Sequence, residues 1–215
     1  MSEAERNDHR SKHFRGVAAL RNKRATPLHA IAGSDSLLAR CVAGDDLAWR
    51  ELHRNLHPTA AAFLRQMGLQ GDEVDDVCQD VFVQLVRYLP RFEHRADLKT
   101  WLYKICASQA GRVRRRRAVR GVIARLVRET MESPAGVADP AWHAFEGRRQ
   151  MEQALVRMNP RQRLVFVLYE LQGLRGDEIA RIADCPAATV RGRLREARQI
   201  FSETIGAAAR EEEER

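Results

Sequence analysis

The segment from Asp72 to Leu89 constrains the fold more than any other part of the sequence. Its apolar residues recur at intervals of three and four without interruption: Val74, Val77, Cys78, Val81, Phe82, Leu85, Tyr88 and Leu89. This period places them on one face of an α-helix, which must be buried against other helices. Asp72 and Glu73 favour a helix start, because the helix dipole stabilises carboxylates in the first turn. Pro90 predicts the end of the helix.

The rest of the chain favours the same class of structure. Helical periodicity also runs through residues 36–42, 46–67 (with a bend expected at Pro58) and 98–106. After a stretch rich in Pro and Gly at 133–140, it returns at about 142–157, 161–171, 177–183 and 187–205. We therefore predict an all-α protein with two small helical domains, at 34–118 and 142–205. Residues 1–33 are expected to form a flexible basic extension, 119–141 a flexible linker and 206–215 an acidic tail.

The charge of the chain predicts anionic partners. Its net charge is +8, and two separate basic blocks carry much of it, with +9 over residues 97–128 and +3 over 161–200. Separate blocks favour specific contact surfaces. The four cysteines lie far apart without a C-x-x-C pair, so we expect reduced thiols and neither metal nor cofactor. No apolar run approaches the ~20 residues of a membrane span, and we expect a cytoplasmic protein.

Residues 177–198 have the layout of a helix-turn-helix, in which a short helix and a sharp turn precede a longer helix. Ile179, Ala180 and Ala183 are expected to pack against Val190 and Leu194. The second helix carries arginines at positions i, i+4 and i+7. Two small residues precede them, at the N-terminal end of the helix that would enter a major groove. This predicted DNA-reading surface consists of Ala188, Thr189, Arg191, Arg195 and Arg198. The alternative is an Arg-rich helix that is merely solvated.

The block from Lys99 to Arg120 is a second candidate for binding nucleic acid. Its cations can neutralise phosphates, and an outward Tyr103 beside Trp101 would offer aromatic surfaces to unpaired bases. The spacing of Trp101 with Leu98 and Leu102 indicates instead that Trp101 is mainly structural. An RNA-binding or membrane-surface tract is an open alternative for the arginine run.

Five segments together resemble the extracytoplasmic-function subfamily of bacterial sigma factors. They are SLLARCVAGDDLAWREL (from Ser36), DDVCQDVFVQLVRYLPRF (from Asp75), LKTWLYKI (from Leu98), MNPRQRLVFVLYELQGL (from Met158) and the helix-turn-helix. The resemblance covers residues 35–118 and 145–203. It implies that the first range is region 2, which binds the polymerase clamp and the minus-ten element, and that the second is region 4, which binds the minus-thirty-five element.

The resemblance also implies roles for individual residues. Those expected to bind core polymerase are Asp75, Asp76, Gln79, Asp80, Val83 and Gln84. Those expected at minus-ten DNA are Phe92, Glu93, His94, Arg95, Lys99, Trp101, Tyr103, Lys104, Arg112 and Arg115. The residues expected to bind the minus-thirty-five element are those of the helix-turn-helix surface given above. The implied partners are core RNA polymerase, through its beta-prime clamp and beta flap, promoter DNA and an anti-sigma factor.

The sequence departs from the family pattern at a few positions. Ala107-Ser108 stands where Arg-Asn is common, Arg175-Gly176 replaces a capping Ser, and Glu196 replaces a frequent basic residue. These departures put the promoter sequence in doubt but leave the helical core intact.

Two other kinds of protein compete with this interpretation. An enzyme or metal protein would use Asp72, Asp75, Asp76 and Asp80 with the pairs His9/His13 and His53/His57, but neither His pair has a third ligand nearby in sequence. We therefore expect no enzyme activity. A stand-alone helix-turn-helix regulator would ordinarily need a dimerisation or ligand domain, which residues 35–118 do not resemble.

Overall fold

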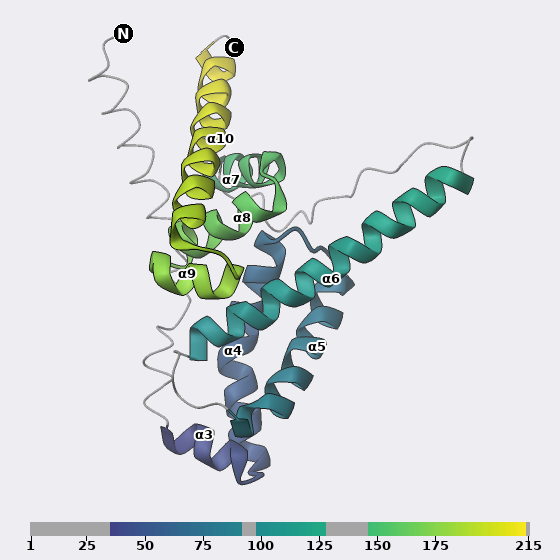
Figure 1. Ribbon diagram of the computed structural model, residues 1–215, viewed down its shortest axis with the longest axis vertical. Helices are drawn as coiled ribbons and strands as arrows, with labels where there is room; N and C mark the ends of the chain where they lie inside the picture. Colours follow the sequence, from purple (N-terminus) through teal and green to yellow (C-terminus); the bar gives the residue numbers. More distant parts are fainter. Residues whose placement is uncertain (1–34, 92–97, 128–145, 214–215) are drawn as a thin grey trace. The chain divides into compact units, whose positions relative to one another are not determined.

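The computed structural model describes residues 35–91, 98–127 and 146–213, and within these ranges all regular elements are helical (Figure 1). The chain divides into two compact units, one mainly of residues 31–140 and the other mainly of residues 141–215. The predicted all-α class and the two helical domains are confirmed. No helix in the described ranges is long and apolar enough to span a membrane.

The first unit contains α3 (Asp35–Val42), α4 (Asp46–Gln66), α5 (Asp72–Tyr88), the 3-10 turn η1 (Leu89–Arg91) and α6 (Leu98–Val127). Asp45 starts α4, because its carboxylate accepts hydrogen bonds from the backbone N–H of Leu47 and Ala48 at 2.9 and 3.2 Å. It also accepts from Arg40 Nε at 2.8 Å. The Trp49 indole donates to the Cys41 carbonyl at 2.9 Å, which joins α3 to α4.

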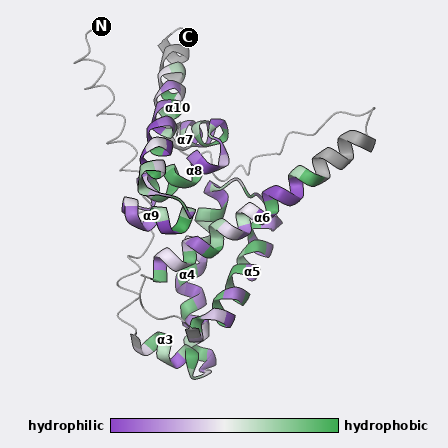
Figure 2. Cartoon of the chain, viewed as in Figure 1, coloured by the Kyte–Doolittle hydropathy of each residue, from purple (hydrophilic) through white to green (hydrophobic). Residues whose placement is uncertain are grey.

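The core of the first unit is formed by the apolar faces of α4, α5 and α6, and Figure 2 shows how apolar and polar residues share each of these helices. Phe63 of α4 packs on Tyr103 of α6, with ring centroids 4.9 Å apart. The predicted inner face of α5 is buried except at Tyr88, which is 44% exposed. Val42, expected to face inward from α3, is 50% exposed.

Two helices of this unit differ from those that the sequence indicated. Pro58 lies inside α4, which continues as one α-helix on both sides of it. Proline removes one backbone hydrogen bond, and the burial of Leu56 and Ala60 on either side offsets that loss. α6 continues to Val127, so residues 119–127, assigned above to the linker, are helical. The second half of α6 extends beyond α5 (Figure 1).

The second unit contains α7 (Glu146–Arg157), α8 (Pro160–Phe166), the π-helical turn η3 (Val167–Leu171), α9 (Gly176–Ala183) and α10 (Ala187–Glu213). These elements match the four predicted segments closely. α10 is longer than expected, since residues 206–213 of the predicted acidic tail are part of the helix. Phe166 and Phe201 pack with ring centroids 5.3 Å apart and tie α8 to α10.

Candidate nucleic-acid interface

The turn between α9 and α10 has the geometry of a helix-turn-helix. Asp184 adopts the left-handed conformation, with φ 48° and ψ 56°, and ends α9 abruptly. The Cys185 N–H then donates to the Ala180 carbonyl at 3.1 Å, and the Val190 N–H donates to the Pro186 carbonyl at 3.1 Å as α10 begins. Aspartate tolerates this conformation better than most side chains do, so the turn needs no glycine.

The inner side of the helix-turn-helix is apolar. Ile179, Val190 and Leu194 are buried, as predicted. Ala180 and Ala183 are only half-buried, whereas Ile182 is buried and was missed. The spacing of Ile179 and Ile182 at i and i+3 contained that signal. The packing leaves the opposite side of α10 exposed.

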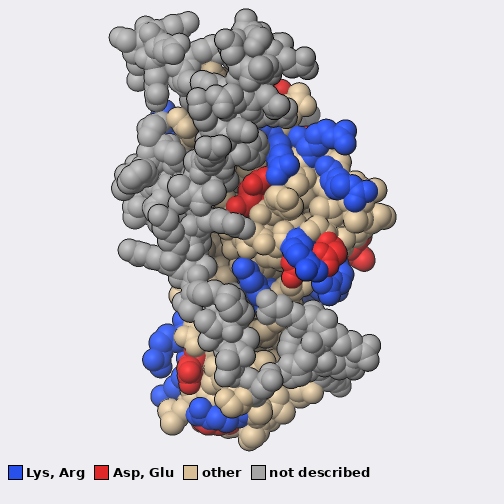
Figure 3. Space-filling view, turned by 90° about the vertical axis from the view of Figure 1, so that its left-hand side faces the viewer, with Lys and Arg blue, Asp and Glu red and all other residues tan. Residues whose placement is uncertain are grey.

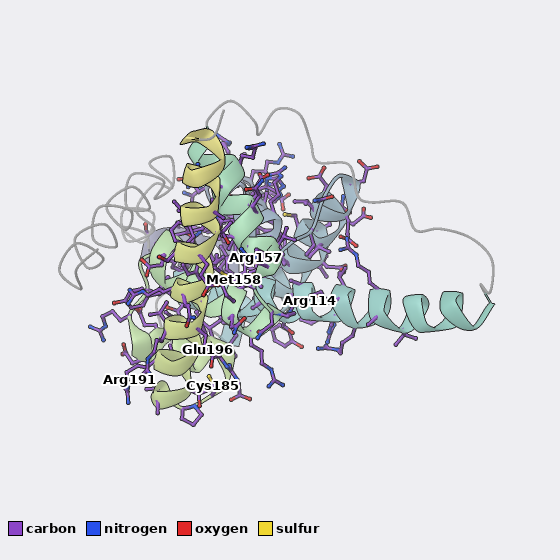
Figure 4. All side chains as sticks on the ribbon, turned by 90° about the horizontal axis from the view of Figure 1, so that it is seen from above. Arg114, Arg157, Met158, Cys185, Arg191 and Glu196 are labelled. Atoms are coloured by element: carbon purple, nitrogen blue, oxygen red, sulfur yellow. The ribbon has the colours of Figure 1, made fainter. Side chains whose placement is uncertain are left out.

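The first turns of α10 present cations to solvent. Ala188, Arg191 and Arg195 are exposed, and Thr189 is half-buried. Figure 4 labels Arg191 on α10 at the end beside the turn that carries Cys185. Exposed arginines at this end of the second helix are placed as a major-groove surface requires. We call Ala188, Thr189, Arg191 and Arg195 the α10 surface.

Arg198 does not share this arrangement, although its spacing placed it in the same predicted stripe. Its Nε donates to Glu170 Oε1 at 2.8 Å, and its Nη2 lies 2.7 Å from the same oxygen. The guanidinium carbon also lies 5.1 Å from the Tyr169 ring centroid. Arg198 therefore holds α10 against η3 and is half-buried, so it is less open to solvent than Arg191 and Arg195, with which its spacing grouped it.

The basic face of α6 is partly as predicted. Lys104, Arg112 and Arg115 are exposed, and Lys99 is half-buried with Nζ 6.0 Å from the Tyr103 ring centroid. We call Lys104, Arg112 and Arg115 the α6 cations. Their exposure leaves them accessible to phosphates.

The burial of the aromatic residues of α6 differs from the prediction, most clearly at Tyr103. Tyr103 was expected to lie outward, but it is fully buried against Phe63 and offers no ring face to a base. Trp101, expected inward, is half-buried. α6 is approached by both α4 and α5, so its buried face is wider than the stripe that Leu98 and Leu102 alone indicate. A phenol ring fits such a face as well as an aliphatic side chain.

The arginine run on α6 is not a uniform cationic surface. Arg117 forms an ion pair with Glu73 of α5. Arg114 is half-buried, and its Nη1 is buried without a hydrogen-bond partner in the part of the chain that the structure describes. Burial, and secondarily the charge of Arg115, lowers the pKa of Arg114. Arg114 and Arg117 are one turn apart, a spacing that could have separated them from the exposed cations.

The predicted loop residues Phe92, Glu93, His94 and Arg95 lie outside the described residues. The charged side chains that are described form several groups, and on the face shown in Figure 3 some Lys and Arg groups have carboxylates beside them. Arg175 and Asp177 at the start of α9 form an ion pair at 2.9 Å. This pair holds the pKa of the exposed Asp177 carboxyl below its usual range. Arg175 thus replaces a capping side chain by a local ion pair.

The outer face of α5 carries a continuous polar stripe. Its members are all exposed except Gln84, which is half-buried, and we call them the docking stripe: Asp75, Asp76, Gln79, Asp80, Val83 and Gln84. Val83 is 60% exposed at the C-terminal end of this stripe, one turn after Gln79 and Asp80. The stripe thus presents carboxylates, amides and one apolar side chain to solvent on the same face of α5.

A groove between α4 and α5 was not predicted from sequence. Its lining includes Trp49, His53, His57, Phe82 and Val86. The imidazoles stack with centroids 5.1 Å apart, and His53 packs on Phe82 at 4.3 Å. Burial, and secondarily the charge of His57, lowers the pKa of His53. Among the described residues no group of three or more side chains could hold a metal ion, so this pair lacks a visible third ligand.

Two family models match the chain, one for each unit. Sigma-70 region 2 matches residues 52–129, and Sigma-70, region 4 matches residues 148–200. The chain thus carries both sigma regions, one in each unit. A stand-alone helix-turn-helix regulator would not carry region 2, and that alternative is rejected.

The relatives narrow the class further. The ECF RNA polymerase sigma-E factor of Escherichia coli (strain K12) is 29% identical over 177 residues, which cover 79% of this chain and 92% of the relative. The ECF RNA polymerase sigma factor SigM of Mycobacterium tuberculosis (strain ATCC 35801 / TMC 107 / Erdman) is 29% identical over 171 residues, covering 79% and 83%. This chain belongs to the extracytoplasmic-function sigma factor family. It directs promoter-specific transcription initiation by core RNA polymerase, and sigma factors are in general not enzymes.

Solved structures show the same fold. CnrH, in complex with the cytosolic domain of CnrY, has a TM-score of 0.57 and 25% identity, and the match covers 80% of this chain and 96% of CnrH. The sigma factor RpoE from Bartonella quintana, in complex with the anti-sigma factor NepR, has a TM-score of 0.60 and 20% identity, covering 73% and 96%.

Proposed function

We propose that this sigma factor divides its work among three surfaces, the first of which is the docking stripe on α5. Asp76, Gln79 and Asp80 supply acceptors and an amide, and Val83 supplies an apolar contact beside them. A basic helix of the polymerase would complement this stripe in charge. The buried face behind it keeps α5 in place, so the stripe serves binding without being needed for the core.

The second surface contacts the opened minus-ten strand through the α6 cations. Lys104 and the exposed arginines can neutralise phosphates of a single strand. Of the two aromatic residues, only Trp101 retains an accessible part. Tyr103 has an indirect role, because its packing on Phe63 in the core helps to fix the orientation of α6. Arg117 likewise acts through its ion pair with α5.

The third surface is the α10 surface, which reads the intact minus-thirty-five duplex. The single observation that carries the proposal is the left-handed turn at Asp184, after which α10 projects Arg191 and Arg195 into solvent. A helix presented in this way fits the width of the DNA major groove. Arg198 contributes by holding the helix to η3.

We further propose that an anti-sigma factor controls this protein and that it acts in the cytoplasm, where polymerase works. Support comes from CnrH, which is similar over most of its length and was solved with the cytosolic domain of CnrY. A partner that covers the docking stripe would block polymerase binding. A partner that covers the α6 cations or the α10 surface would block promoter binding.

Run-off transcription tests the proposed function. Purified core polymerase, with and without the full chain, is given genomic fragments that include the DNA upstream of the chain's own gene. We expect defined transcripts only when the chain is present, and a docking-stripe variant with reversed charges should abolish them. Transcripts that are equal with and without the chain on every fragment would refute the proposal.

A further inference from the structure

Glu196 is an unexpected residue on the DNA-reading half of α10. Between Ala187 and Arg198 this helix carries four arginines, and Glu196 is its only acidic residue. The side chain is exposed. Phosphates repel a carboxylate, so such a group on a DNA-facing helix costs binding energy unless it meets a hydrogen-bond donor. Donors in the major groove belong to the bases and not to the backbone.

Glu196 is held in position by a side chain from α8. Gln162 Nε2 donates to Glu196 Oε2 at 2.8 Å. The other end of Gln162 is fixed too, because its Oε1 accepts from the Asn159 N–H at 3.0 Å in the capping box that starts α8. A carboxylate has about four acceptor positions, and a single accepted hydrogen bond leaves room for another donor. The carboxylate is thus oriented yet still able to bind.

The surface next to this carboxylate is open on the side that faces the start of α10. Side chains on a helix lean toward its N-terminus, so residue 196 covers the surface above residue 192. That residue is Gly192, where an added Cβ would meet nothing within 4 Å. The missing side chain at position 192 therefore leaves open space one turn before Glu196, on the same half of α10 as Arg191, and Figure 4 labels both residues on this helix. The gap lets a base edge approach the carboxylate.

We propose that Glu196 is a specificity-determining residue that accepts a hydrogen bond from the N4 amino group of a cytosine in the minus-thirty-five duplex, and that Gln162 is its positioning residue. This inference rests on the proposed function of the α10 surface. Cytosine N4 is the donor that carboxylates pair with in the major groove. The neighbouring arginines offset the repulsion between the carboxylate and the phosphates. The same pairing rejects a thymine or guanine, which present acceptors there.

Selection from a randomised duplex tests the inference. Holoenzyme made with the full chain is allowed to select minus-thirty-five sequences, and the preference at each position is compared between wild type and variants. We expect the wild type to select cytosine at one position, and Glu196→Ala to lose roughly tenfold of that preference there alone. Glu196→Gln keeps an acceptor for Gln162 but should favour adenine, which a glutamine amide recognises. Gln162→Ala should weaken the cytosine preference partially.

The matched control is Glu203→Ala, which removes a carboxylate about two turns further along the same helix, where it accepts from Gln199 at 3.0 Å. It should leave every base preference unchanged. The inference is overturned if Glu196→Ala selects the same sequences as wild type, or if it changes affinity equally for all sequences. A wild-type holoenzyme that selects no sequence at all would instead refute the proposed role of the α10 surface, and this inference with it.

Discussion

Breaking the contact between Arg198 and Glu170 should destabilise the second unit without removing a DNA contact. The pair joins α10 to η3, and Tyr169 lies beneath the guanidinium. The variants are Arg198→Ala, Glu170→Ala and the double mutant, all in the full chain. Together they form a double-mutant cycle, which isolates the energy of the pair from the effects of each truncation.

The size of the effect follows from geometry and exposure. Two nitrogens of Arg198 share one oxygen of Glu170, at 2.8 and 2.7 Å. Charge-assisted hydrogen bonds contribute about 1.5–3 kcal/mol and fully exposed pairs about 0–1 kcal/mol. The side chains here are 36% and 13% exposed, so we expect a coupling energy of about 1–2 kcal/mol. Arg198→Ala should lower the stability of the unit more than Glu170→Ala does. It also removes a cation–π contact of about 0.5–1 kcal/mol, and it leaves the carboxylate of Glu170, the less exposed partner, without its ion pair.

Hydrogen exchange of peptides from residues 187–205, measured at increasing urea concentration, reports the opening free energy of this unit alone. The salt dependence of promoter binding gives an independent check. Loss of one phosphate contact lowers the log–log slope by about 0.9, so Arg195→Ala should lower it and Arg198→Ala should not. A coupling energy below about 0.3 kcal/mol, or equal slope changes for both arginines, would refute the reasoning.

Three further predictions concern the other surfaces. Reversing Asp76 and Asp80 to Arg should weaken polymerase binding ~10-fold or more with little change in thermal stability. The control reverses the exposed Asp46 and Glu51 of α4 and should leave polymerase binding unchanged. Equal losses of binding in both variants would contradict the role of the docking stripe. Arg191→Ala or Arg195→Ala should impair closed-complex binding but spare a template already melted at the minus-ten element. Changes in the α6 cations should instead impair opening, measured by permanganate reactivity. Equal loss of closed-complex binding in both groups, with rescue of neither by melted DNA, would contradict this division. Burial raises the pKa of Cys78 from 9.0 to about 11, so the unfolded chain ionises first and the urea midpoint should fall as pH rises from about 9 to about 11; a Cys78→Ala variant with the same pH dependence would exclude this cause.

Periodicity predicted which helices form and which residues of α5 are buried, because burial of an apolar stripe is the main force that orients a helix. The pattern was less informative for α6, where two neighbouring helices widen the buried face. Tyr103 is buried there, although a phenol is compatible with either side, and it packs on Phe63 of α4. Helix ends were also underestimated. Residues 119–127 have the apolar spacing of a further amphipathic turn or two but include Gly121, and residues 206–213 begin with Gly206, so helix propensity did not predict how far either helix continues.

Arg198 shows why the spacing on α10 predicted which residues share a face of the helix but not which of them contact a neighbouring element. Arg191 and Arg198 lie seven positions apart and so point in nearly the same direction, about 20° apart. They differ in height along the helix, and at the level of Arg198 the neighbour is η3. The hydrogen bond from the Gln172 N–H to the Val167 carbonyl, at 3.0 Å, has the π-helical spacing of i to i+5 and closes η3.

The π-helical spacing explains how the acceptor reaches that arginine. One residue more than an α-helical turn is accommodated between Val167 and Gln172, which rotates the chain by about 100° relative to a continuous α-helix. Tyr169 and Glu170 lie within this turn, and both contact Arg198. Helical periodicity assumes a constant 3.6 residues per turn and cannot show an inserted residue. The contacts of Tyr169 and Glu170 with Arg198 could therefore not be predicted from the sequence. The same insertion fixes α10 from behind, which leaves Arg191, Arg195 and Glu196 at its free end to meet the duplex.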